Sequence, residues 1–446
     1  MQSSSGGLAV VRRLALFGLV PFAAACGART GLPIDERAAP PSGVCGSETS
    51  EHPLLPMCTS TTTLRSFVPG ADAHSDTLCP DGCSGGACTG YPAGSVSGAE
   101  RHSCAVTLGE ATKCWGLGDY GELGDGSTSG SLVPVDVMGL GSGVLAVEAA
   151  AFFTCALLRG GHVRCWGLNN GGQLGDGSNV DSAAPVDVVA LGSGVAAISA
   201  GSGHTCALTA GGGVRCWGAN ISGMLGDGSN VESASPVGVA GLGSGAIAVS
   251  AGASHTCALT LAGAVQCWGL NGYGQLGDGS TVDSSVPVDV VGLDARVVAL
   301  AAGLHHVCAL TQCGRVACWG RNVSGQLGDG SKTDSPVPVD VIGLGSDVVA
   351  LASHWGHTCA LTRAGRVACW GSNRHGQLGD GATTDSLVPV DVVGLGSDVV
   401  AIAAGWGHTC AVSSDEGVAC WGHNADGELG DGSVVGSSVP VDVVGL

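Results

Sequence analysis

The chain has 446 residues, more than one ordinary domain needs, and 79 of them are glycine without a three-residue period, which excludes collagen. With 12% charged and 44% hydrophobic residues, it is neither a charged disordered polymer nor a coiled coil. The 17 basic and 37 acidic residues give a formal net charge of −20. Binding to nucleic acid, or to a membrane through charge, is therefore not expected, because it requires a basic patch.

The N-terminus predicts export. Arg12 and Arg13 precede an apolar run over residues 14–25, which suits a signal-peptide core and is shorter than the ~20 residues that span a bilayer. The run ends in Ala-Ala-Ala-Cys26, which resembles a bacterial lipoprotein box except that Ala23 stands where leucine is usual. We predict a signal peptide over residues 1–25 and lipidation of Cys26, with cleavage at an Ala-x-Ala site and free secretion as the alternative. The protein would then be an outer-membrane lipoprotein, or periplasmic or extracellular.

Residues 26–93 are predicted to form a Cys-rich, low-complexity tether, because they contain Pro-Pro and Ser/Thr runs and lack a core-forming pattern. If Cys26 carries lipid, six cysteines remain outside the repeats described next: Cys45, Cys58, Cys79, Cys83, Cys88 and Cys313. Six cysteines can pair in 15 ways, so their connectivity stays open. A bond from the tether to Cys313 would tie it to the fifth repeat.

A 51-residue unit is repeated seven times over residues 94–446. The tripeptide Cys-Trp-Gly recurs at a constant interval of 51, at Cys114, Cys165, Cys216, Cys267, Cys318, Cys369 and Cys420. Each unit has four short apolar runs bounded by turn residues, which is typical of strands, and none has a helical period. In the third unit the predicted strands are residues 195–200, 205–209, 214–218 and 236–239. The predicted fold is all-β: a seven-bladed β-propeller of four-stranded antiparallel blades.

The unit is similar to the repeat of a known family. In the fifth to seventh copies it reads H-x-C-A-L-T, a short gap, R-V-A-C-W-G, x-N-x-x-G-Q-L-G-D-G and V-P-V-D-V-x-G-L. This string resembles the regulator of chromosome condensation repeat over about residues 95–446, and the resemblance implies a seven-bladed propeller that serves as a binding platform. The nucleotide exchange activity of the family's nuclear founder is not expected, because the unbroken spacing leaves no inserted wedge and the chain is acidic.

A second cysteine lies ten residues before each Cys-Trp-Gly. A hairpin turn centred on Gly211 would place Cys206 opposite Cys216, near the distance that a disulfide requires. We predict seven within-repeat disulfides: Cys104–Cys114, Cys155–Cys165, Cys206–Cys216, Cys257–Cys267, Cys308–Cys318, Cys359–Cys369 and Cys410–Cys420. Reduced core thiols and zinc ligation are the alternatives, although zinc ligands normally cluster at shorter spacings. Typical eukaryotic members of the family do not carry both cysteines at these positions, so the pairs fit an exported variant.

Other recurring residues have structural interpretations. A histidine stands two residues before the first cysteine, at His102, His204, His255, His306, His357 and His408, and Phe153 replaces it in the second unit. One histidine per blade is too widely spaced for a shared metal ion. We expect the aspartate of L-G-D-G to form Asx-type turns, with calcium binding as the alternative, and the Cys-Trp-Gly tryptophans to lie in the core. No catalytic motif is found, so neither metal, cofactor nor enzymatic activity is predicted.

Binding residues are expected in the loops, where the repeats differ. In a meander blade, the loop between strands one and two and the loop between strands three and four lie at the same end. Trp355 and Trp406 occupy equivalent positions in the first loop of adjacent units. The second loop carries Tyr120, Tyr273, Arg321, Arg374, His375, His423 and Asp426.

Aromatic residues and arginine are enriched in binding hot spots. The candidate binding residues are therefore Trp355, Trp406, Tyr120, Tyr273, Arg321, Arg374 and His375. The predicted function is a non-catalytic scaffold that binds a protein partner in the bacterial envelope and meets the membrane only through its lipid anchor. Carbohydrate or cell-wall binding through the two tryptophans is the alternative, and the tryptophans could also merely pack between blades.

Overall fold

The computed structural model describes residues 95–415 and 417–446, together with five short strands between residues 57 and 88. These are β1 Met57–Cys58, β2 Thr63–Ser66 and β3 Ser75–Leu78 in one antiparallel sheet, and β4 Cys83–Ser84 and β5 Ala87–Cys88 in a second. The sequence did not predict these strands. The predicted signal peptide, Cys26 and most of the predicted tether lie outside the described residues.

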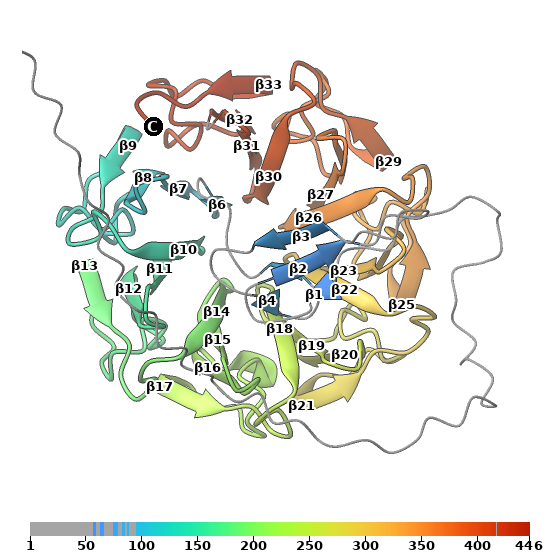
Figure 1. Cartoon of the computed structure of the whole chain (residues 1–446), viewed down its shortest axis with the longest axis horizontal. Helices are drawn as coiled ribbons and strands as arrows, with labels where there is room; N and C mark the ends of the chain where they lie inside the picture. The colour runs from blue at the N-terminus through green and yellow to red at the C-terminus, as the bar shows by residue number, and fades with distance from the viewer. Residues whose placement is uncertain are drawn as a thin grey trace, which may run out of the picture. The chain divides into compact units, whose positions relative to one another are not determined.

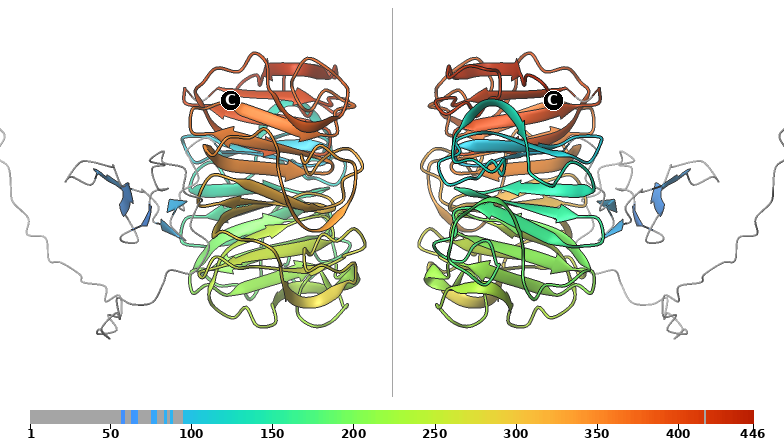
Figure 2. Two further views of the ribbon diagram at one scale, coloured as in Figure 1. Left: turned by 90° about the vertical axis from the view of Figure 1, so that its right-hand side faces the viewer. Right: turned by 90° about the vertical axis from the view of Figure 1, so that its left-hand side faces the viewer.

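From Ser95 onward the chain forms seven four-stranded antiparallel sheets around a central axis (Figure 1), which confirms the predicted β-propeller. Each sheet is a meander whose strands pair in chain order, so no blade combines strands from the two ends of the repeat region. The loops form the two ends of the propeller, as the side views in Figure 2 show. Among the described residues, no helix has the length and hydrophobicity that crossing a membrane requires.

The strands occupy equivalent ranges in the seven blades. The first, innermost strands are β6 Ser95–Gly98, β10 Val144–Ala149, β14 Val195–Ala200, β18 Ala246–Ala251, β22 Val297–Ala302, β26 Val348–His354 and β30 Val399–Ala404. The second strands are β7 His102–Val106, β11 Phe153–Leu158, β15 His204–Thr209, β19 His255–Thr260, β23 His306–Thr311, β27 His357–Thr362 and β31 His408–Ser413.

The third strands contain Cys-Trp-Gly: β8 Thr112–Gly116, β12 Val163–Gly167, β16 Val214–Gly218, β20 Val265–Gly269, β24 Val316–Gly320, β28 Val367–Gly371 and β32 Val418–Gly422. The outermost strands are β9 Ser131–Asp136, β13 Ser182–Asp187, β17 Ser233–Gly238, β21 Ser284–Asp289, β25 Ser335–Asp340, β29 Ser386–Asp391 and β33 Ser437–Asp442. A single 3-10 turn, η1 Ile221–Gly223, is the only helical element in the described residues. In the third blade, three strands match the prediction to within a residue, whereas β17 begins three residues earlier because Ser233 pairs with Gly218.

The two cysteines of each blade lie directly opposite each other on the second and third strands, as the pairing of Cys206 with Cys216 shows. The structure joins each pair in a disulfide, with Cα atoms 4.0–4.1 Å apart. All fourteen side chains are fully buried between blades. Cys313, half-buried at the tip of the β23–β24 hairpin, is also disulfide-bonded.

The tryptophan of each Cys-Trp-Gly packs against the preceding blade and is fully buried, as predicted. Trp166 of the second blade donates from Nε1 to the carbonyl oxygen of Glu122 in the first, at 2.8 Å. A Cβ atom on Gly124 would lie 2.6 Å from the same indole nitrogen, so this position requires glycine. Trp115 of the first blade donates to Glu428 O of the seventh at 2.8 Å. The ring therefore closes through the same contact that joins every other pair of blades.

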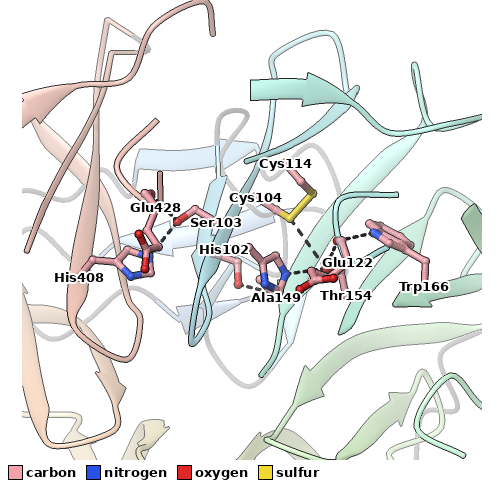
Figure 3. The surroundings of a disulfide bond; sticks show 11 residues. His102, Ser103, Cys104, Cys114, Glu122, Ala149, Thr154, Trp166, His408 and Glu428 are labelled. Atoms are coloured by element: carbon pink, nitrogen blue, oxygen red, sulfur yellow. Dashed lines mark hydrogen bonds between the residues drawn. A yellow bond between two sulfur atoms is a disulfide. The ribbon is translucent and has the colours of Figure 1, made fainter. Parts of the chain in front are cut away.

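The repeated histidine also joins neighbouring blades. His102 Nε2 lies 2.8 Å from Thr154 Oγ1 of the next blade (Figure 3). At the ring closure, His408 Nε2 lies 2.8 Å from Ser103 Oγ. Burial lowers the pKa of His102 to about 3 and that of His408 to about 4, so both rings are neutral at pH 7. These contacts agree with the structural role predicted for this position.

Hydrogen bonds within the long loop between the third and fourth strands hold its conformation. Asp176 accepts hydrogen bonds from the Ser178 backbone N–H and from its hydroxyl, both at 2.9 Å, which is the expected Asx-type turn. Asn169 donates from Nδ2 to Ser178 O and Val180 O at 3.1 Å and accepts from Leu174 N at 2.9 Å. The role of this asparagine was not predicted, although it recurs in every unit except the first, where Gly118 replaces it. The loops at this end of the propeller are thus held firmly.

Candidate binding face

Because every blade is a meander, the loops that join the first strand to the second and the third to the fourth lie at one end of the propeller. We call this end the candidate face. All seven predicted binding residues belong to its loops, but the structure distributes them over separate places around the ring. Among residues 95–415 and 417–446, no three His, Cys, Asp or Glu side chains gather as a metal site.

Trp355, Trp406, His375 and His423 form one group at the junction of the sixth and seventh blades, which we call the Trp–His cluster. The two indole rings are 5.7 Å apart and meet edge to face at 70°. Trp406 also lies 5.2 Å from His375 and 5.3 Å from His423, and the two imidazoles are 4.8 Å apart. Both tryptophans are half-buried and His375 is exposed. Trp406 is therefore the centre of an aromatic surface built from two blades.

Charged groups fix one side of this cluster. His423 Nδ1 lies 2.7 Å from Glu428 Oε1, and this hydrogen bond raises the pKa of His423 above its ordinary value. Burial acts to raise the pKa of Glu428, but hydrogen bonds led by that of His423 outweigh it, so the pKa lies below the ordinary value. Burial, together with the neighbouring His423, lowers the pKa of His375. His423 is therefore protonated more readily than His375.

A salt bridge of 2.7 Å between Arg101 and Asp426 crosses from the first blade to the seventh beside the cluster. The backbone N–H of Trp406 also donates to Ala99 O at 2.8 Å. The Trp406 loop is therefore tied to the blade that closes the ring.

Two other predicted residues meet at the junction of the fourth and fifth blades. The guanidinium of Arg321 lies 5.0 Å from the ring centre of Tyr273, within the range of a cation–π contact. The same tyrosine is 5.1 Å from His305, whose pKa is lowered to about 4 by burial and by Arg321. This pair forms a second, smaller aromatic surface.

The remaining predicted residues stand apart. Tyr120 is 40% exposed and packs edge to face on Phe152 of the next blade at 5.5 Å. Arg374 is exposed beside His375. Glu428, which orients His423, was missed by the sequence analysis. The sequence did carry a sign of it: the second residue of G-x-L-G is glutamine in most units but glutamate at this position.

The structure thus defines a disulfide-rich β-propeller whose aromatic groups lie in loops at one end. Comparison with known proteins identifies its family. The model of the RCC1-like domain matches residues 192–446, and that of the Regulator of chromosome condensation (RCC1) repeat matches residues 114–157 and 160–208. The chain belongs to the RCC1 repeat family, as the resemblance in the repeat unit indicated.

Individual relatives extend over most of the repeats. The ultraviolet-B receptor UVR8 of Arabidopsis thaliana is 33% identical over 352 residues, which is 77% of this chain and 80% of the receptor. The E3 ubiquitin-protein ligase HERC2 of Homo sapiens is 34% identical over 71% of this chain, but the match covers only 7% of the ligase. The crystal structure of Prp20p from Saccharomyces cerevisiae superposes with a TM-score of 0.66 at 22% identity, over 75% of this chain and 85% of that one. At this identity, the Prp20p structure supports the fold alone.

Proposed function

We propose that the chain is an exported, non-catalytic propeller that binds a protein partner through the candidate face, with the Trp–His cluster as the centre of the contact. The observation that carries this proposal is the packing of Trp406 against Trp355, His375 and His423 on a surface loop. Large aromatic side chains held in one conformation lose little entropy on binding, and tryptophan is among the residues that contribute most to interfaces.

The relatives support a binding role. Prp20p is described with its binding properties to Gsp1p and histones, and UVR8 is a receptor. Ligase activity is not proposed, because the match covers only 7% of HERC2. Nucleotide exchange is not proposed either, because the chain is acidic and its repeats contain no insertion.

Export is part of the proposal. It rests on the apolar run over residues 14–25, on Cys26 in a lipoprotein-box context, and on a disulfide in every blade, since disulfides persist in oxidising compartments. The proposed division of the chain is a signal peptide over residues 1–25, a Cys-rich tether over 26–93 and the propeller over 94–446. Labelling of producing cells with a radioactive fatty acid tests lipidation. The Cys26→Ala variant should lose the label, and an unlabelled parent protein cut before Cys26 would indicate free secretion.

Carbohydrate binding is the second candidate, because paired tryptophans can stack on sugars. The 70° angle between the two indole planes leaves no continuous flat platform across both rings, which favours a protein partner. Competition with soluble glycans from the producing cell's own envelope separates the two. Release of the captured ligand by these glycans would favour the carbohydrate alternative.

The direct test compares capture from envelope extract by the oxidised full-length chain and by the Trp355→Ala/Trp406→Ala variant. A matched control, Leu108→Ala/Leu261→Ala, removes two exposed apolar side chains from hairpin tips at the opposite end. We expect the tryptophan variant to lose the ligand and the leucine variant to keep it. If the tryptophan variant proves unfolded by circular dichroism, His375→Ala, at an exposed position of the same cluster, replaces it. Equal capture by all folded variants would contradict the proposal.

A further inference from the structure

The seven innermost strands enclose a central channel with a volume of about 410 Å³. The residues that line it are mainly small or aliphatic, with several serines, one glutamate and one histidine among them. This volume lies in the range of cavities that bind small molecules. The channel is separate from the Trp–His cluster.

One level of the channel is polar on one side only. The residue paired with the first cysteine of each blade lies at the same height in every innermost strand and lines the channel. In chain order these residues are Ser97, Glu148, Ser199, Ser250, Ala301, Ala352 and Ala403. We call the first four the polar arc. The other three blades present only methyl groups at this level, so the cross-section of the channel is amphipathic.

Among the residues that the structure describes, Glu148 is the only acidic one that lines the channel. Its carboxyl group makes no hydrogen bond or salt bridge with any residue that the structure describes. Burial raises its pKa to about 8. The other ionisable residue in the described part of the channel wall is His354, whose pKa burial lowers to about 4, so it is uncharged at neutral pH. A ligand near Glu148 therefore encounters no competing positive charge from the described residues of the channel wall.

Serines occupy the equivalent position in both neighbouring innermost strands, because β10 packs between β6 and β14. Ser97 Oγ accepts a hydrogen bond from Ala149 N at 2.9 Å, and Ser199 Oγ accepts one from Ala251 N at 3.0 Å. A hydroxyl oxygen has two acceptor sites, so each serine retains one for a ligand.

We propose that the central channel binds a small primary ammonium compound with an apolar body. The ammonium group would lie at the polar arc, where its three N–H donors match the Glu148 carboxylate and the hydroxyls of Ser97 and Ser199. The apolar body would lie against Ala301, Ala352 and Ala403. Attraction between the two charges is stronger here than in bulk water, because the innermost strands surround the channel and the dielectric constant close to protein is lower than that of water. This site is independent of the function proposed for the candidate face.

The test is isothermal titration calorimetry of the oxidised full-length chain with cyclohexylammonium chloride at pH 9 and pH 6. Cyclohexanol, which has a similar apolar body and no charge, is the control ligand. At pH 9 Glu148 is ionised and an alkylammonium, with a pKa near that of lysine at ~10.4, is still charged. We expect one saturable site at pH 9, at least about tenfold weaker binding at pH 6 because Glu148 must first lose its proton, and no binding of cyclohexanol.

Two variants with the same change in net charge locate the site. Glu148→Gln should weaken binding at least about tenfold, whereas Glu232→Gln, at an exposed position in the β16–β17 loop, should leave it unchanged. If Glu148→Gln fails to give the circular dichroism spectrum of the parent, Ser199→Ala, which keeps the carboxylate, should weaken binding several-fold. Absence of saturable binding at pH 9, parental affinity in a folded channel variant, or an equal loss in Glu232→Gln would overturn the proposal.

Discussion

Val307 of the fifth blade occupies the position of the threonine that would pair with His255 of the fourth, and the ring of His255 has no hydrogen bond to any described residue. In other blades, the repeated histidine bonds the hydroxyl of a threonine 52 residues ahead, as His204 does with Thr256 at 2.8 Å. The residue 52 positions after His255 is Val307, which has no hydroxyl. Both ring nitrogens of the fully buried His255 lack a partner in the described residues. Thr256 Oγ1 in turn donates to Met224 O at 3.0 Å, so its oxygen accepts from the histidine Nε2. The junction of the fourth and fifth blades therefore lacks the hydrogen bonds that run from histidine to threonine to a backbone carbonyl elsewhere in the ring.

Restoring the missing hydroxyl should stabilise the propeller. Val307→Thr keeps the side-chain shape and supplies an acceptor for His255, and we expect it to raise the free energy of unfolding by about 1 kcal/mol. The converse change, Thr256→Val, should lower it by about 1–3 kcal/mol, because it leaves the buried His204 Nε2 unpaired. Urea denaturation under oxidising conditions measures both. If both Val307→Thr and Thr256→Val lower the free energy of unfolding relative to the parent, this explanation is contradicted.

The buried histidines should make the protein sensitive to acid. Burial lowers the pKa of His102, His255, His306 and His357 to about 3, and that of His204 and His408 to about 4. Unfolded histidine binds a proton below about pH 6.5, whereas these folded rings do not, so stability is retained above that pH and lost as the pH falls towards 4. Melting temperatures should fall steeply between pH 7 and pH 5. An unchanged melting temperature over this interval would show that the rings are protonated in the folded protein.

Glu148 should act in the opposite direction. Its folded pKa of about 8 lies above the ordinary value of 4.5, so its contribution to stability is present below pH 4.5 and is lost as the pH rises to 8. Glu148→Gln should therefore melt at a higher temperature than the parent at pH 9 and differ little at pH 4.5. Glu232→Gln serves as the control, since its carboxylate is exposed. If Glu148→Gln and the parent have the same melting temperature at pH 9, this carboxylate is hydrated in the folded protein and its pKa is not raised.

The within-blade disulfides should account for a measurable part of the stability. Each closes a loop of ten residues, for which the chain-entropy model gives about 3 kcal/mol or less. Cys257→Ala/Cys267→Ala should lower the urea midpoint by a corresponding amount, and a reducing agent should lower it further. Peptide mapping of the non-reduced protein should recover the pair Cys257–Cys267. Alkylation of these cysteines in denatured, unreduced protein would indicate reduced core thiols.

The repeat explains why the fold was predictable. Seven copies of Cys-Trp-Gly at six equal intervals required seven equivalent units, and the register that places Cys206 opposite Cys216 followed from the hairpin at Gly211. The start of β17 was misplaced because its first three residues, Ser233, Ala234 and Ser235, include two serines and so do not continue the apolar run used to identify strands. The buried tryptophans and the bridging histidines followed from their recurrence.

The candidate site was less predictable, because it depends on single departures from the repeat. Equivalent positions in adjacent units indicated that Trp355 and Trp406 lie near each other, but not that His375 and His423 both contact Trp406. Those contacts are made between loops of two blades. They depend on the directions of the side chains, which a repeat pattern does not specify. Glu148 was missed because a glutamate in one of seven similar strands is visible as a channel residue only when the strands are arranged in a ring.

Photo-cross-linking tests the central claim, that the candidate face binds a partner, most directly. A photoreactive phenylalanine analogue is placed at Ala425, an exposed position beside the Trp–His cluster, and in a second protein at Leu261, which is 65% exposed at the opposite end of the propeller. Irradiation in envelope extract should yield one specific adduct from the Ala425 position, lost in the Trp355→Ala/Trp406→Ala background, and none from Leu261. An adduct from Leu261 alone, or the same adduct from both positions, would contradict the assignment of binding to this face.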